Sequence, residues 1–144
     1  MAYALTADLI ARFGRDELLQ LTDRSGVDRV DEAVVGAAIA DAGASIDGYL
    51  AARYALPVAP TPALLTRIAC DLARFYLHGP SATELVRKGF EDAQRILRDL
   101  ADGRAVLAGA AVAVPGSSPA APGGSVQVAA PERRVDAGHL AGFF

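Results

Sequence analysis

Apolar residues recur at steps of three and four along most of the first hundred positions, which is the spacing of one face of an α-helix. The strongest such stretch spans residues 63–78. Thr61 is expected to cap this helix, with Pro62 in its first position, and Gly79 and Pro80 are expected to end it. The stretch predicts the central core helix of the domain, whose apolar face comprises Leu64, Leu65, Ile68, Ala69, Leu72, Phe75 and Tyr76.

Three helices are expected before the central one. Two are short and cover Thr6 to Gly14, with Thr6 as the cap, and Asp16 to Leu21. A long helix begins at Asp31 and is expected to run to about Tyr54. Beside its apolar seam it carries a stripe of very small residues, which fits either close helix packing within one subunit or contact between subunits; the stripe consists of Gly36, Ala40 and Gly43.

A fifth helix is expected after the central one, from a capping box formed by Ser81 and Glu84 to about Asp102. After Gly103 the composition changes to short apolar stretches separated by Pro, Gly and Ser, which is typical of linkers. We therefore predict an all-α bundle in residues 1–102, with two short leading helices and three longer ones. Residues 103–144 are predicted to form an extended, partly β-prone arm.

Composition narrows the classes of function. The chain has 144 residues, of which 52% are hydrophobic, and a net charge of -3, so it lacks the basic footprint expected of a nucleic-acid-binding protein. Its first residues do not form the basic and apolar pattern of a secretory signal. Charge, Gly or Pro interrupts every apolar stretch of membrane-spanning length. We expect a soluble protein that is made in the cytoplasm and does not associate with a membrane.

Residues with catalytic or metal-binding chemistry are sparse. His78 and His139 are far apart in sequence and belong to no recognisable pair, and His78 is expected to interact with the C-terminal end of its helix. Cys70, the single cysteine, falls on the apolar side of the central helix and is expected to be a buried structural thiol. The segment from Asp23 to Asp28 fits a turn better than a calcium loop. We expect no enzymatic activity, no cofactor and no metal site.

Two groups of residues are candidates for partner binding. The first lies opposite the apolar face of the central helix and consists of Arg67, Asp71 and Arg74, which fit either a solvated face with internal charge pairs or a subunit interface. The second lies in the arm, where paired arginines and phenylalanines fit either an unstructured tail or a docking peptide. Its members are Arg133, Arg134, Leu140, Phe143 and Phe144.

Several blocks of the sequence carry a family resemblance. The opening Tyr3-Ala-Leu-Thr-Ala-Asp-Leu-Ile-Ala-Arg-Phe-Gly, the block Asp47-Gly-Tyr-Leu with the following Arg53-Tyr and Leu56-Pro, and the block Ile68-Ala-Cys-Asp-Leu-Ala-Arg resemble a family of small proteins of Mu-like phages. The resemblance covers about the first hundred residues. That family is similar to the head–tail connector proteins of long-tailed phages.

The resemblance implies a helical adaptor in the virion neck. Such adaptors form a ring, usually twelve-fold, below the portal, so the implied partners are further copies of the chain, the portal protein and a tail or stopper protein. DNA would pass through the channel without specific binding. From the residues alone, a small helical regulatory or nucleic-acid-binding module is an alternative, although its one dense basic segment, Arg87 to Arg98, is interleaved with acids.

Overall fold

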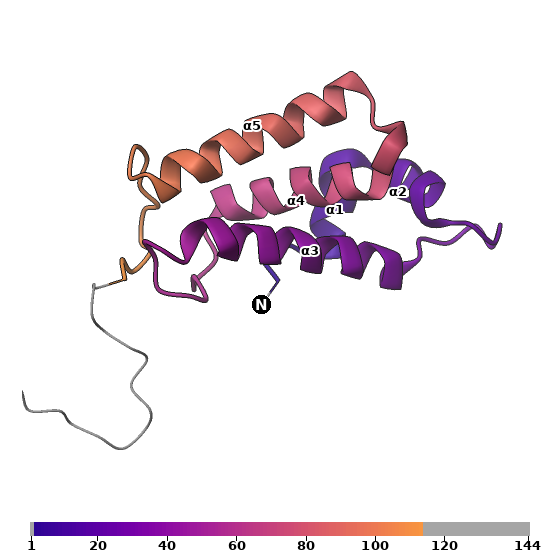
Figure 1. Cartoon of the computed structure of the whole chain (residues 1–144). Helices are drawn as coiled ribbons and strands as arrows, with labels where there is room; N and C mark the ends of the chain where they lie inside the picture. The colour runs from indigo at the N-terminus through magenta and orange to yellow at the C-terminus, as the bar shows by residue number, and fades with distance from the viewer. Residues whose placement is uncertain (1, 114–144) are drawn as a thin grey trace, which may run out of the picture. The chain divides into compact units, whose positions relative to one another are not determined.

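The computed structural model describes residues 2–113. Within this range the elements in chain order are α1 (Thr6–Phe13), α2 (Arg15–Thr22), α3 (Glu32–Leu50), α4 (Ala63–His78), the single 3-10 turn η1 (Gly79–Ser81) and α5 (Glu84–Ala101) (Figure 1). The described residues contain no strand, only an isolated β-bridge. The prediction of an all-α fold with two short leading helices and three longer ones is confirmed.

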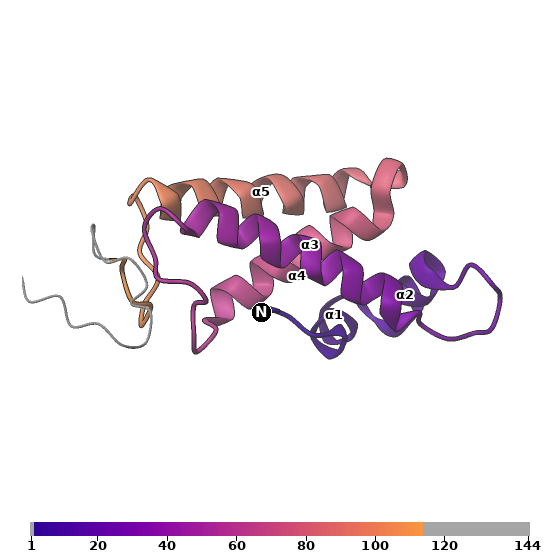
Figure 2. The ribbon, with the colours of Figure 1, turned by 60° about the horizontal axis from the view of Figure 1, so that its bottom comes forward.

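The central position predicted for α4 is confirmed. This helix contacts α1, α2, α3 and α5, and it lies behind α3 and below α5 in Figure 2. Cys70 is fully buried there, and burial raises the pKa of its thiol to about 11. The core is completed by apolar residues of all five helices and of the N-terminal segment, among them Tyr3, Leu9, Leu18, Val35, Ile39, Ile46, Leu65, Ile68, Leu72, Leu97 and Leu100.

The starts of two helices differ from the sequence prediction by one residue. The N-cap residue of α1 is Leu5 rather than Thr6. The Leu5 N–H donates a hydrogen bond to the carboxylate of Asp8, in the first turn of the helix, at 2.8 Å, so this backbone group has an acceptor. The residue before α4 is Pro62 rather than Thr61, and no side chain caps this end. The first N–H groups of a helix have no acceptor within it, and Pro62 has no N–H, so this start has one fewer donor to satisfy.

The capping residue of α5 is Thr83, so the capping box predicted from Ser81 is wrong. The Val86 N–H donates to Thr83 Oγ1 at 3.4 Å. Ser81 belongs instead to the turn η1, where its hydroxyl donates to the carbonyl of His78 at 2.8 Å. The 3-10 turn takes up the three residues after α4, which shifts the start of α5 along the chain.

The long helix α3 ends at Leu50, four residues before the predicted Tyr54. Tyr54 forms an antiparallel bridge with Val112, and its hydroxyl accepts a hydrogen bond from the Leu107 N–H at 3.1 Å. Leu107 itself is buried in the core. Residues 103–113, which the sequence assigned to the arm, therefore pack onto the helical bundle as part of the same compact unit.

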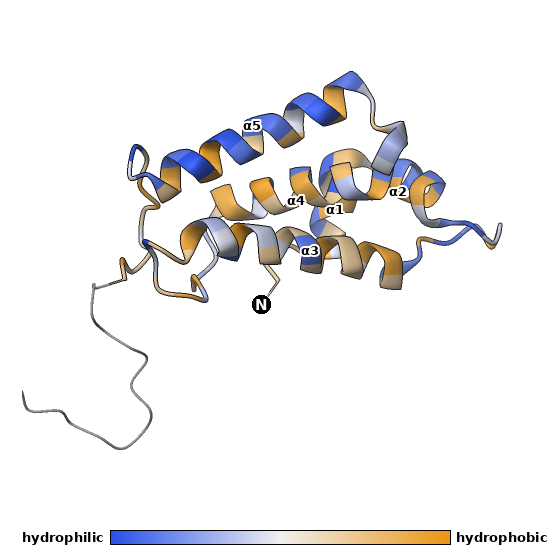
Figure 3. Cartoon of the chain, in the orientation of Figure 1, coloured by the Kyte–Doolittle hydropathy of each residue, from blue (hydrophilic) through white to orange (hydrophobic). Residues whose placement is uncertain are grey.

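Hydropathy is distributed unevenly over the helices (Figure 3). The outer side of α5 is strongly hydrophilic, whereas α3 is apolar or neutral along most of its length. Contrary to the expectation from its Asp and Gly residues, α3 is long and apolar enough to cross a membrane by length and composition alone. Its larger apolar side chains face the core of the bundle, where Val35, Ile39, Ile46 and Leu50 are buried.

Candidate partner-binding surfaces

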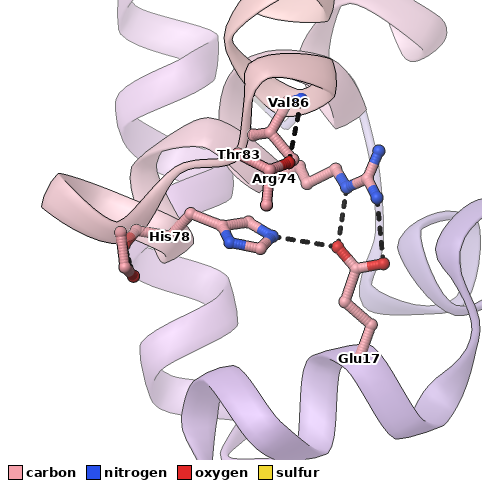
Figure 4. A network of polar contacts seen from close by, with 6 residues as sticks. Glu17, Arg74, His78, Thr83 and Val86 are labelled. Atoms are coloured by element: carbon pink, nitrogen blue, oxygen red, sulfur yellow. Dashed lines mark hydrogen bonds and ion pairs between the residues drawn. The ribbon is translucent and has the colours of Figure 1, made fainter.

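One predicted partner-binding residue, Arg74, belongs to a polar network that joins α2 to α4 (Figure 4). Arg74 Nε donates to Glu17 Oε1 at 2.7 Å and Arg74 Nη2 donates to Glu17 Oε2 at 3.0 Å, which is a bidentate pair. His78 Nε2 lies 3.0 Å from the same Oε1. Arg74 and His78 are one helical turn apart on α4, so both side chains reach the single carboxylate on α2.

The network is largely shielded from solvent, because the side chains of Glu17, Arg74 and His78 are 24%, 21% and 14% exposed. Burial alone would raise the pKa of Glu17, but the hydrogen bonds and charges of Arg74 and His78 hold it below its usual value. The Arg74 guanidinium also lies 4.3 Å from the centre of the Phe13 ring, a cation–π contact with α1. Arg74 thus ties together three helices of one subunit.

The other two candidates on α4 differ in exposure. The Arg67 side chain is 60% exposed, whereas that of Asp71 is 25% exposed, and Arg67 Nε lies 4.0 Å from Asp71 Oδ2. Burial raises the pKa of Asp71, against the opposing charges of Arg67, Arg12 and Arg74. Of the α4 candidates, Arg67 is therefore the one that remains open to a partner. The candidates in the arm, from Arg133 to Phe144, lie outside the described residues.

An apolar groove runs along the outside of α3 and has a volume of about 430 Å³. One wall is the N-terminal segment, which is held in place because the Tyr3 hydroxyl donates to the Asp47 carboxylate. Burial, followed by this hydrogen bond and the Asp47 charge, raises the pKa of Tyr3 to about 12. The lining residues are Ala2, Ala4, Leu5, Thr6, Gly36, Ile39, Ala40, Gly43, Ala44 and Asp47.

The floor of the groove contains the stripe of small residues singled out in the sequence. Gly43 is buried, whereas Gly36 and Ala40 are exposed. A Cβ atom added at Gly36 would meet no atom within 4 Å, so packing inside the described unit does not explain this glycine. The α3 stripe consequently serves two purposes: Gly43 packs within the bundle, and Gly36 and Ala40 leave a smooth surface open outside it.

A second, more polar cavity of about 700 Å³ lies under the connection between α2 and α3. Its loop is ordered by Asp23, whose carboxylate accepts hydrogen bonds from the N–H groups of Val27 at 3.1 Å and Asp28 at 2.8 Å. Thr22 is buried at its base, where its hydroxyl donates to the Leu18 carbonyl and accepts from the Asp31 N–H. The turn expected at Asp23 is confirmed. In residues 2–113 no three His, Cys, Asp or Glu side chains gather as a metal site would require.

Sequence reasoning did not identify three features of these surfaces: Glu17 as the partner of Arg74, the Tyr3–Asp47 bond, and the exposed Leu85 on α5. Leu85 is 71% exposed, a high value for a large apolar side chain. The available signal for Glu17 was the spacing of Arg74 and His78, since two basic groups one turn apart can share an acid. The spacing predicts that Leu85 widens the apolar seam of its helix, and its exposure shows that this prediction is wrong.

Comparison with known proteins gives consistent matches. The family model described as "Bacteriophage Mu, Gp36" matches residues 3–127, a range that contains every helix of the bundle. Gene product J of Escherichia phage Mu is 44% identical over 105 residues, which cover 72% of this chain and 74% of that protein. The Mu-like prophage FluMu protein gp36 of Haemophilus influenzae is 39% identical over 101 residues, which cover 70% of this chain and 72% of that protein. The arm residues from Arg133 onward lie beyond the family match.

Proposed function

The chain belongs to the bacteriophage Mu Gp36 family, and on that basis we propose that it is a structural protein of the virion, the head–tail connector of a Mu-like phage or prophage. In this role it acts as an adaptor. Copies form a ring below the portal, in the neck of the particle, and join the DNA-filled head to the tail.

The observation that carries the proposal is the family match over the whole helical bundle. The pairing of polar side chains within the bundle supports it. Glu17, Arg74 and His78 satisfy one another within the subunit and leave no free carboxylate beside a free base. The open surfaces include an apolar groove on α3, the exposed Arg67 of α4 and a charged face on α5. Such surfaces suit contacts with other proteins rather than turnover of a small substrate.

The proposed partners are other copies of this chain, the portal protein and a tail or stopper protein. A closed ring requires each subunit to present two different surfaces that fit one another. The net charge of -3 supports a channel through which DNA slides without specific binding. We take the ring to be a dodecamer in the particle.

Cryo-electron microscopy of the particle tests this role. We expect density that fits residues 2–113, repeated around the neck between the portal and the tail. Copies located elsewhere in the particle, or absent from it, would contradict the proposal. Phages depleted of the protein provide a second test, since filled heads and separate tails should accumulate.

A binding measurement separates this role from a nucleic-acid-binding module. For an adaptor, the isolated full chain should show no DNA affinity that falls steeply with added salt. Tight, salt-sensitive binding of duplex DNA would favour the regulatory alternative, because neutralised phosphates release counterions in proportion to the contacts made.

A further inference from the structure

We propose that α1 and α2 form a flap that moves away from the bundle as one unit, and that the contact of Glu17 with Arg74 and His78 is the clasp that holds this flap shut. The flap comprises residues 6–22, and the body that it covers comprises α3, α4 and α5. This inference concerns the folded subunit and does not rest on the proposed function.

The flap lies along one row of side chains on α4. Cys70, Arg74 and His78 are spaced four residues apart, so they follow one another along the same side of the helix. α1 and α2 both contact α4 (Figure 2). Arg74 contacts Phe13 of α1 and Glu17 of α2, and His78 contacts Glu17 as well. The two short helices are therefore attached to the same side of α4 and can leave it together.

Cys70 reports whether this side of α4 is covered. It is the single cysteine of the chain, and its side chain is fully buried. Burial is the main cause that raises the pKa of its thiol to about 11, and the next contributions come from two residues of α1, Arg12, which lowers it, and Asp8, which raises it. A protonated thiol is a poor nucleophile. Cys70 therefore reacts with a thiol reagent only in molecules whose cover has been removed, by opening of the flap or by unfolding.

Few contacts attach the flap to the body. Among residues 2–113 the ion pairs that join the two are those of Glu17 with Arg74 and His78, and the others lie within α4 or at α5 and its C-terminal end. The large apolar side chains that the flap buries are Leu9 and Leu18, whereas α3 and α4 bury apolar residues over several turns each. Helices of eight residues are not stable alone. Opening the flap thus costs only a part of the free energy of global unfolding.

The chain is anchored on both sides of the flap. Before α1, the Tyr3 hydroxyl donates to the Asp47 carboxylate, which fixes the N-terminal segment to α3. After α2, the Asp31 N–H donates to Thr22 Oγ1 at 3.1 Å, and the loop residues 24–29 are exposed. Residues 6–22 are consequently the segment that can move while its two flanks stay on α3.

The clasp is strong enough to control this opening. Arg74 donates two charge-assisted hydrogen bonds to the Glu17 carboxylate, and His78 Nε2 lies 3.0 Å from one oxygen of the same group (Figure 4). The three side chains are between 14% and 24% exposed, so solvent screens them only in part. Replacing the carboxylate by a neutral amide is expected to raise the open population about tenfold, which corresponds to about 1.4 kcal/mol.

Labelling of Cys70 in the full chain tests the flap. The rate of reaction with a dithiodipyridine reagent is measured at pH 7 over a series of low urea concentrations. Opening of the flap exposes little surface, so we expect a rate that barely changes with urea until global unfolding begins. Glu17→Gln should raise this rate about tenfold, and His78→Ala, which removes one of the three contacts, about threefold. A rate that follows the urea dependence of global unfolding at every concentration would overturn the proposal.

Two control variants separate opening of the flap from a general loss of stability. Glu91→Gln removes an exposed carboxylate of α5 and should leave labelling unchanged. Tyr54→Phe removes the acceptor of the Leu107 N–H, beyond the end of α3 and away from the flap. It should lower the urea midpoint of unfolding without changing labelling in the absence of urea. Labelling that Tyr54→Phe accelerates as much as Glu17→Gln does, or that neither clasp variant accelerates, would overturn the proposal.

Discussion

The guanidinium group of Arg53 occupies the space that a side chain at Gly103 would need. Gly103 follows the end of α5 with a φ of +78°, and a Cβ atom there would overlap the Arg53 guanidinium. Arg53 Nε is buried, and no hydrogen-bond partner for it is present among the described residues. The end of α5 and the segment after α3 are therefore fitted against each other at this point.

Replacing Gly103 by alanine should destabilise the protein for two reasons. The left-handed backbone conformation and the displaced Arg53 side chain together are expected to lower the free energy of unfolding by about 2 to 3 kcal/mol. Gly109→Ala is the matched control, because its φ is +77° but no atom lies within 4 Å of the added Cβ. Its expected effect is about 1 kcal/mol. Urea unfolding measures the free energy of unfolding of both variants. Equal losses would show that the Arg53 side chain moves aside at no cost.

Replacing Glu17 by glutamine should make stability less dependent on pH. The pKa of Glu17 is lowered in the folded protein, so its contribution is present above its unfolded pKa and is lost as the pH falls through the folded one. We expect Glu17→Gln to lose about 1 to 2 kcal/mol at pH 7, a value reduced for its partial exposure.

The difference between Glu17→Gln and the unmodified protein should shrink steadily as the pH falls below 4.5, the usual pKa of a glutamate. Denaturant titrations at pH 7, 5, 4 and 3 measure it. Glu91→Gln, at an exposed position of α5, is the control and should show little effect at any of these values. A loss for Glu17→Gln that is unchanged at pH 3 would mean that packing, not charge, accounts for its effect.

Removing the hydroxyl of Tyr54 should loosen the segment that follows α5. In Tyr54→Phe the buried N–H of Leu107 loses its acceptor, which is expected to cost about 1 to 3 kcal/mol. Amide hydrogen exchange should speed up at Leu107 and its neighbours more than in α4. The half-buried Tyr49 provides the control, since Tyr49→Phe should leave exchange at Leu107 unchanged. Uniformly faster exchange throughout the bundle would argue against a local effect.

Deleting residues 131–144 should leave the helical fold intact and impair assembly. The described residues end before this segment, and the buried core found among them draws on all five helices. Circular dichroism should give the same helical content and a melting temperature within a few degrees of the full chain. Complementation of a phage that lacks the gene should yield fewer joined particles. A truncated protein that unfolds would place the segment in the core.

The sequence was sufficient for the number, order and approximate extent of the helices, because the apolar period of α4 and α5 is strong. It was insufficient where one helix end depends on a distant segment. Tyr54 lies beyond the end of α3 and pairs with Val112, although the local spacing of apolar residues predicts that the helix continues to Tyr54. The choice of Thr83 over Ser81 as a cap depends on the three-residue turn η1, which the capping pattern alone does not reveal.

The candidate surfaces were harder to predict than the fold. Arg74 was correctly placed opposite the apolar face of α4, yet helix α2 packs there and supplies Glu17 from 57 residues away in the chain. Periodicity says which side of a helix is polar, but it does not say which other element covers that side. The groove on α3 likewise required the position of the N-terminal segment, which the bond from Tyr3 to Asp47 determines.

The bridge at Tyr54 has a mechanical consequence. The Ala55 N–H donates to the Ala111 carbonyl at 3.0 Å and the Ala113 N–H donates to the Arg53 carbonyl at 2.8 Å, so two backbone hydrogen bonds hold the last described residues to the segment after α3. A pull on the chain beyond Ala113 reaches these two bonds first, and the buried side chains of Tyr54 and Leu107 resist it next. We therefore expect these contacts to break before α5 begins to unwind under such a pull.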